Sequence, residues 1–184
     1  MPVRVIVVMG VSGSGKTTLG RALASALCVP FLDADDFHPP ENIAKMSRAE
    51  PLDDADRAPW LAKLASAIRE HLELAGAVVA CSALKQTYRQ TLTAGDPRIV
   101  FVYLRGSFEI IDQRLRARAN HFMSAKLLQS QFVALEEPES AIVVDVRDSA
   151  DHQVASVLRE LARLPSLDEG PVQSAGQSPT ERKA

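Results

Sequence analysis

The segment GVSGSGKT, from Gly10 to Thr17, constrains the fold of this chain more strongly than any other part of its sequence. It has the pattern G-x-x-x-x-G-K-[ST], follows an apolar run at residues 3–9, and precedes a helical pattern that begins at Leu19. Glycines allow backbone N–H groups to converge on phosphate oxygens, and the N-terminus of the following helix adds partial positive charge. The pattern predicts a strand, a phosphate-binding loop (P-loop) and a helix that together bind a nucleoside triphosphate.

Two side chains of the P-loop have expected roles of their own. Lys16 is expected to reach the β- and γ-phosphates, which makes it a candidate catalytic residue, and the Thr17 hydroxyl is expected to ligate Mg²⁺. The alternative, a glycine-rich turn that binds nothing, is disfavoured by the strand before it and the helix after it. The predicted nucleotide-binding residues are Gly10, Val11, Ser12, Gly13, Ser14, Gly15, Lys16, Thr17 and Thr18.

The apolar pattern of the rest of the chain predicts an α/β fold. Continuous apolar runs at residues 3–9, 29–32, 77–81, 99–104 and 141–146 are typical of strands that are buried on both faces of a parallel sheet. Between these runs, apolar residues recur at helical steps, and Pro59 fits a helix that begins near Asp56. Strands that alternate with helices indicate a wound α/β domain with right-handed crossovers. The helical positions are Leu61, Leu64, Ile68 and Leu72; Phe108, Ile111 and Leu115; Leu128, Phe132 and Leu135; and Val154, Val157, Leu158 and Leu161.

Composition narrows the class of protein further. The 184 residues, 46% hydrophobic and 24% charged, suit a single globular domain. A formal net charge of −2 gives no basic footprint for nucleic acid, and no apolar run approaches the roughly 18 residues of a membrane span. We therefore expect neither a nucleic-acid partner nor a membrane partner.

The two ends of the chain and its cysteines bear on location and domain limits. Arg4 followed by the apolar stretch Val5 to Val11 resembles a signal peptide, but that stretch is short and leads directly into the glycine-rich loop. Two cysteines, Cys28 and Cys81, cannot form a disulfide framework, which favours a cytoplasmic protein. Residues 165–184 are rich in Pro, Gly, Ser and charge, so we expect a domain at 1–164 and a disordered tail at 165–184.

A pair of aspartates follows the second predicted strand. Asp33 and Asp35 lie at the C-terminal end of that strand, where open α/β sheets bind their ligands, and a two-residue period places them on one face. One carboxylate can hold a water of a Mg²⁺ shell, and the other can accept a proton from an attacking hydroxyl. The alternative, a helix cap before Pro40 or a solvent-exposed position, suits Asp36. A GTPase switch protein is disfavoured, because the chain has neither D-x-x-G nor N-K-x-D.

Two polar clusters carry positive charge toward this region. The segment CSALKQTYR, residues 81–89, follows the third predicted strand. Arg114 and Arg118 share a helical face before a loop and a helix whose N-cap could be Ser124, whereas Arg116 suits a solvated face. Arginines on a lid can stabilise a transferring phosphoryl group and exclude water. His38 and His121 lack the spacing of metal ligands, which disfavours zinc.

Taken together, these segments resemble a known family, the small P-loop gluconokinases. The resemblance implies ATP-dependent phosphorylation of D-gluconate at its 6-hydroxyl, with Mg²⁺. It also implies a nucleoside-monophosphate-kinase-like fold, a five-stranded parallel sheet in order 2-3-1-4-5 with flanking helices, a lid at about 117–127, and a homodimer. The matching segments are MGVSGSGKTT, FLDADDFHPPENIAKM, EPLDDADRAPWL, VVACSALKQTYR, RLRARANHFM and SQFVALEEP.

The resemblance and the strand-end geometry together suggest roles at the acceptor site. Asp35 is the expected base, Asp33 is expected to bind Mg²⁺ through water, and Arg118, with Arg114 as second choice, is the expected catalytic arginine. Gluconate is a small polyol anion that needs a cation and several hydrogen-bonding groups. Its candidate carboxylate partners are Arg57, Lys85 and Arg89, and its candidate hydroxyl partners are His38, Asn42, Ser82 and Tyr88, with the pairings left open. Two alternatives remain, a shikimate-kinase-like enzyme and a non-catalytic ATP-binding module.

Overall fold

A computed structural model describes residues 3–48, 50–117 and 125–165 of the chain. Strands and helices alternate through most of this length, as the apolar pattern predicts. The elements in chain order are β1 (Val5–Met9), α1 (Lys16–Leu27), β2 (Phe31–Asp33), the 3₁₀ helix η1 (Ala34–Phe37), α2 (Pro40–Ser47), α3 (Asp54–Leu72), β3 (Ala77–Ala80), α4 (Gln86–Thr93), β4 (Ile99–Arg105), α5 (Phe108–Ala117), α6 (Ala125–Ala134), β5 (Ile142–Asp145) and α7 (Ala150–Arg163).

The five strands form one parallel sheet in the order β2-β3-β1-β4-β5. This arrangement confirms the predicted order 2-3-1-4-5. The central strand β1 pairs with β3 and β4, so that Val7 lies between Val79 and Phe101. All five residues of β1 are buried, whereas the edge strands β2 and β5 are only partly buried. The continuous apolar pattern therefore predicts the central strands more clearly than the edge strands.

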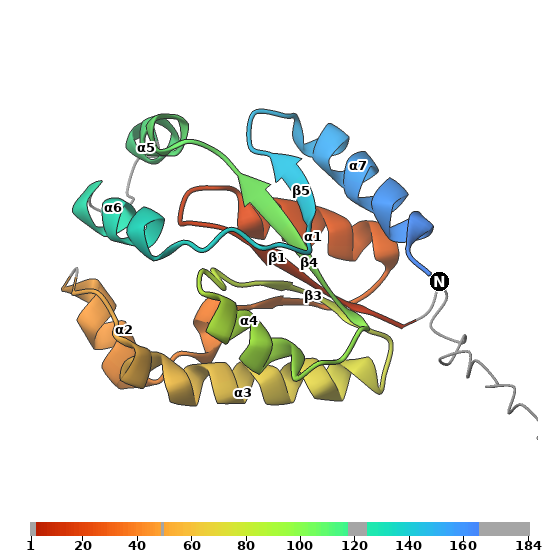
Figure 1. The fold of residues 1–184 in the computed structure, drawn as a ribbon, viewed down its shortest axis with the longest axis horizontal. Coiled ribbons are helices and arrows are strands. Elements are labelled where there is room, and N and C mark those ends of the chain that lie inside the picture. The colour runs from red at the N-terminus through yellow and green to blue at the C-terminus, as the bar shows by residue number, and fades with distance from the viewer. Residues whose placement is uncertain (1–2, 49, 118–124, 166–184) are drawn as a thin grey trace, which may run out of the picture.

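Helices cover both faces of the sheet and also stand at one of its ends (Figure 1). Helices α1 and α7 pack on one face through residues such as Leu23 and Val157, and α3 and α4 pack on the other through Leu64 and Leu92. A smaller apolar cluster joins α5 and α6 to the loops after the strands. Its buried members are Val11, Leu84, Ile111, Leu115 and Leu128.

Two helices differ from the sequence prediction. Helix α3 begins at Asp54 rather than near Asp56, because Asp53 accepts from the Asp56 backbone N–H at 2.8 Å while Asp56 accepts from the Asp53 N–H. Pro59 consequently lies beyond the first turn, where proline removes one helical hydrogen bond. Helix α4 was not predicted, because its few apolar residues give no clear helical period.

Most of the predicted lid and almost all of the predicted tail lie outside the described residues. Most of the lid expected at 117–127 falls on residues 118–124, between the end of α5 and the start of α6, and lies outside the described residues. The tail expected at 165–184 lies outside them as well, apart from Pro165. In the described part of the chain, no helix combines the length and the apolar character that a membrane crossing requires.

Candidate active site

The P-loop joins β1 to α1 at the C-terminal end of the sheet. Gly13 and Gly15 have φ angles of 82° and 105°, a left-handed conformation that favours glycine. A Cβ on Gly13 would also lie 2.6 Å from Leu115 of α5, so no larger residue fits there without displacement. The loop therefore brings its backbone to the N-terminus of α1, where N–H groups and the helix dipole suit phosphate.

A cleft of about 480 Å³ lies beside the P-loop. Its walls come from the P-loop, the end of β2 with η1, the end of α2 and the segment after it, the first turns of α3, the end of β3, and α6. Eleven predicted site residues line it: Ser12, Gly13, Gly15, Lys16, Thr17, Thr18, Asp33, Asp35, His38, Arg57 and Ser82. Of the other predicted nucleotide-binding residues, Gly10, Val11 and Ser14 are buried in the loop. A second hollow of about 440 Å³ at Val3, Leu27 and Leu164 is also lined by Arg4 and holds no P-loop residue.

Thr17 and Asp33 form a pair of oxygen donors beside the P-loop. The Thr17 hydroxyl donates to Asp33 Oδ2 at 3.2 Å. A hydroxyl and a carboxylate are ligands that suit Mg²⁺, which usually keeps several waters and takes few protein ligands. Thr17 and Asp33 therefore fit the predicted Mg²⁺ site. No group of three or more His, Cys, Asp or Glu side chains that could hold a metal ion occurs among the described residues.

Asp35 reaches the cleft by a different route from the one predicted. The strand ends at Asp33 and the chain enters η1, so the two-residue period of a strand does not extend to Asp35. Asp33 Oδ1 instead accepts from the Asp35 backbone N–H at 3.3 Å and caps this turn. Burial and the neighbouring Asp33 carboxylate raise the pKa of Asp35, and Lys16 and His38 partly oppose that rise. The aspartate pair still shares the cleft, although Asp35 as a whole residue is exposed to solvent.

His38 is held on two sides by residues of α2 and α3. Its ring stacks on Trp60, and Asn42 Nδ2 lies 3.2 Å from its Nδ1. The same Asn42 amide donates to the carbonyl of Asp56 at 2.8 Å, so Nδ2 is a donor and His38 Nδ1 is its acceptor. Burial lowers the pKa of His38. The ring is thereby assigned as neutral, with its proton on Nε2.

Arg57 is the candidate carboxylate partner that lines the cleft. Its guanidinium donates to the carbonyl of Leu52 and lies 5.7 Å from the centre of the Tyr88 ring. Tyr88 and Lys85 do not line the cleft: the Tyr88 hydroxyl donates to Asp54, and Lys85 Nζ pairs with the same carboxylate at 2.8 Å. Arg57 and Lys85 therefore both lie near the Tyr88 ring, with Lys85 Nζ 5.5 Å from its centre.

Other predicted residues lie away from the cleft wall. Arg89 is buried and donates to the carbonyls of Ala83 and Leu84 at 2.9 and 3.0 Å, so it holds the loop after β3. Asn42 also lies behind the wall, and Arg114 donates to the carbonyl of Val146. Arg118 lies outside the described residues.

Cys81 lines the cleft as well, and burial raises its pKa to about 12, so its thiol stays protonated. Both Cys81 and Cys28 are free thiols.

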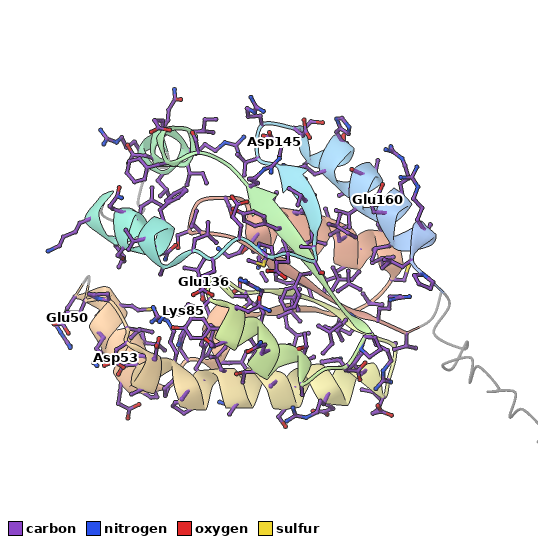
Figure 2. All side chains as sticks on the ribbon, in the orientation of Figure 1. Glu50, Asp53, Lys85, Glu136, Asp145 and Glu160 are labelled. Atoms are coloured by element: carbon purple, nitrogen blue, oxygen red, sulfur yellow. The ribbon has the colours of Figure 1, made fainter. Side chains whose placement is uncertain are left out.

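Sequence reasoning missed the contribution of α6 and the segment after it. Gln131 Oε1 accepts from the Ser12 backbone N–H at 2.7 Å, and Glu136 Oε2 accepts from the Gln86 N–H at 2.6 Å. Figure 2 shows Glu136 close to Lys85, where this segment meets the start of α4. The only sequence signal was the motif SQFVALEEP, which contains both Gln131 and Glu136 but states no partner for either.

Comparison with known proteins agrees with this site. A family model described as shikimate kinase matches residues 12–162. The gluconokinase of Gluconobacter oxydans (strain 621H) is 47% identical over 161 residues, which cover 87% of this chain and 90% of that protein. The thermosensitive gluconokinase of Escherichia coli (strain K12) is 43% identical over 155 residues, covering 84% of this chain and 83% of that protein.

The chain belongs to the gluconokinase family.

Structural comparison also finds a gluconokinase. A crystal structure of a gluconokinase from Sinorhizobium meliloti 1021 matches with a TM-score of 0.78 and 46% identity, covering 88% of this chain and 93% of that one. The predicted P-loop kinase fold is therefore confirmed. Residues 12–162, which the shikimate kinase family model matches, include most of the P-loop, the aspartate pair and the CSALK segment.

Proposed function

We propose that this gluconokinase transfers the γ-phosphoryl group of ATP to the 6-hydroxyl of D-gluconate, giving 6-phospho-D-gluconate and ADP. One observation carries the proposal: the P-loop residues Lys16 and Thr17 and the carboxylate of Asp35 line the same cleft. A phosphate donor and a hydroxyl acceptor held there would meet at the C-terminal end of the sheet. Relatives named gluconokinase support gluconate as the acceptor.

The donor side of the site binds and neutralises phosphate. The backbone N–H groups of residues 13–17 and the ammonium group of Lys16 would hold the β- and γ-phosphates. Thr17 and, through water, Asp33 would hold Mg²⁺, which when bound neutralises charge on the phosphate oxygens. The 3.2 Å contact between the Thr17 hydroxyl and Asp33 supports this assignment, since it brings both oxygens to one place.

The acceptor side positions gluconate and takes one proton. Asp35 would accept the proton of the 6-hydroxyl as its oxygen attacks phosphorus, and its raised pKa brings it closer to that of a useful base. Arg57 would hold the substrate carboxylate with two parallel hydrogen bonds. The Nε2–H of His38 and the Ser82 hydroxyl, which both line the cleft, would form hydrogen bonds with substrate hydroxyls.

Several finer features belong to the same proposal. Arg118 remains the proposed arginine that stabilises the transferring phosphoryl group, because positive charge near the equatorial oxygens favours the transition state. Arg114, the second choice, would first have to leave the carbonyl of Val146, to which it donates away from the cleft wall. We further propose a cytoplasmic homodimer, on the resemblance and the two free cysteines. Sedimentation of the purified enzyme would test the dimer.

A coupled assay of ADP release tests the acceptor. Gluconate, shikimate, other sugar acids and nucleoside monophosphates are compared side by side with ATP and Mg²⁺. We expect gluconate to give the highest kcat/KM. A higher value for shikimate would favour the shikimate-kinase-like alternative, and ATP binding without turnover of any acceptor would favour the non-catalytic module.

A further inference from the structure

One peptide group of the P-loop is hydrogen-bonded on both sides. The carbonyl oxygen of Val11 accepts from Lys16 Nζ at 3.1 Å and from the Ser14 backbone N–H at 3.2 Å. The N–H of the same peptide group, which belongs to Ser12, donates to Gln131 Oε1 at 2.7 Å. Rotation of this peptide would therefore break contacts at both of its ends.

The Gln131 amide makes a second contact with the same P-loop residue. Its Nε2 donates to the Ser12 hydroxyl oxygen at 3.1 Å, so both ends of the amide are used on Ser12. A backbone N–H can only donate, which fixes the amide orientation with Oε1 toward the Ser12 nitrogen. Gln131 lies in α6, 119 residues further along the chain, and α6 also brings Ser130 to the cleft wall.

We propose that Gln131 is a positioning residue that holds the Val11–Ser12 peptide in the orientation in which the P-loop receives phosphate. Gly10 and Gly13 flank this peptide with φ angles of 142° and 82°, so the loop here has few restraints from its own side chains. When a loop becomes ordered only as its ligand binds, the entropy cost of that ordering weakens the binding, and a loop that is already ordered avoids the cost. Gln131 supplies the order from outside the loop and keeps the Val11 carbonyl beside Lys16.

The inference rests on the proposed nucleotide site but not on the identity of the acceptor. It is tested by calorimetric titration of the full-length enzyme with Mg·ADP in the absence of gluconate. The test variant is Gln131→Met, which keeps the length of the side chain but can form neither hydrogen bond. Its matched control is Gln129→Met, the same substitution at an exposed position of α6 that does not line the cleft.

We expect Gln131→Met to weaken Mg·ADP binding about fivefold to tenfold, the size of effect that one ordinary hydrogen bond accounts for. Gln129→Met is expected to bind as the wild type does, and both variants are expected to melt close to it. Equal affinities of Gln131→Met and the wild type would overturn the inference. Tighter binding by Gln131→Met would also overturn it, because Gln131 would then compete with phosphate for the Ser12 N–H.

Hydrogen–deuterium exchange of the wild-type enzyme gives a second measurement that needs no variant to fold. Because Gln131 ties the loop to α6, Mg·ADP is expected to slow amide exchange in α6 as well as in the P-loop. If Mg·ADP protects the P-loop but leaves exchange in α6 unchanged, the inference is overturned while the proposed function stands. A wild-type enzyme that binds no Mg·ADP would overturn the proposed function together with it.

Discussion

The His38 ring lies face to face on the indole of Trp60, with ring centroids 4.4 Å apart and ring planes 11° from parallel. Trp60 also donates from Nε1 to the carbonyl of Ala34 at 2.7 Å, and Ala34 is the first residue of η1. One buried side chain of α3 thus fixes both the histidine and the turn that carries Asp35. The acceptor side of the cleft is therefore built on α3.

The first prediction concerns the pH dependence of stability. Burial lowers the pKa of His38, with Arg57 acting in the same direction and Asp35 opposing. The pKa of a histidine in the unfolded chain is about 6.5, so as the pH falls below this value the unfolded chain binds the proton more readily than the native enzyme does. Stability from this group is present above that pH and is lost as the pH falls. We expect His38→Gln to show a shallower fall of Tm between pH 7 and pH 5 than the wild type.

The control for this measurement is His152→Gln, at an exposed position in the first turn of α7. It is expected to keep the wild-type slope of Tm against pH. A slope for His38→Gln as steep as that of the wild type would show that His38 does not remain neutral in the native enzyme.

The second prediction assigns the base. Asp35→Asn is expected to lower kcat by about 10²-fold, the low end of general-base effects, because a loose phosphoryl-transfer transition state needs little early proton removal. In the wild type, the raised pKa of Asp35 should make kcat/KM rise with pH on the acidic side, since only the ionised carboxylate accepts a proton. Steady-state kinetics from pH 4 to pH 8 would check both, with exposed Asp36→Asn as the control. Wild-type kcat in Asp35→Asn would refute the role.

The third prediction assigns the carboxylate of the Mg²⁺ site. Asp33→Asn removes the charge beside the Thr17 hydroxyl but leaves an amide oxygen in its place. Residues that act on a metal through a bound group usually change its affinity about 10- to 100-fold. We expect a rise of this size in the Mg²⁺ concentration for half-maximal rate, measured by titration at saturating ATP and gluconate. Loss of turnover that saturating Mg²⁺ does not restore would instead mark Asp33 as the base.

How far the sequence predicts this fold depends on how local each signal is. The P-loop and the buried strands are contained in short segments, so GVSGSGKT and the apolar runs identify them directly. The sheet order came from the family resemblance instead. Helix α4 was missed because polar residues dominate it, and one of its three buried side chains is Arg89, which leaves only Tyr88 and Leu92 as buried apolar positions.

Only the part of the site that depends on local sequence signals was predicted. Strand-end reasoning placed Asp33, Asp35 and Ser82 at one edge, and the cleft contains all three. Sequence alone could not separate Arg57 from Arg89, because the separation depends on the fold of the loop after β3, whose carbonyls Arg89 binds. Contacts between residues distant in sequence, such as Ser12 with Gln131, also leave no pattern in a single sequence.

The last prediction decides which cation holds the gluconate carboxylate. Arg57 lines the cleft, whereas Lys85 is paired with Asp54 and Arg89 with backbone carbonyls. Arg57→Lys keeps a positive charge but loses the planar fork that binds a carboxylate with two hydrogen bonds. Charged hydrogen bonds of this kind contribute about 1.5–3 kcal/mol, so the KM for gluconate is expected to rise about 10- to 100-fold while the KM for ATP stays near wild type.

Comparing gluconate with its uncharged amide as substrates tests which residue binds the carboxylate. The wild type is expected to prefer gluconate over the amide, and Arg57→Met is expected to lose that preference, because only the carboxylate requires a cation. Lys85→Met serves as the control, since it removes a cation that is already paired with Asp54 outside the cleft wall. If Lys85→Met loses the preference and Arg57→Met retains it, the carboxylate lies against α4, and the acceptor is bound in the opposite orientation.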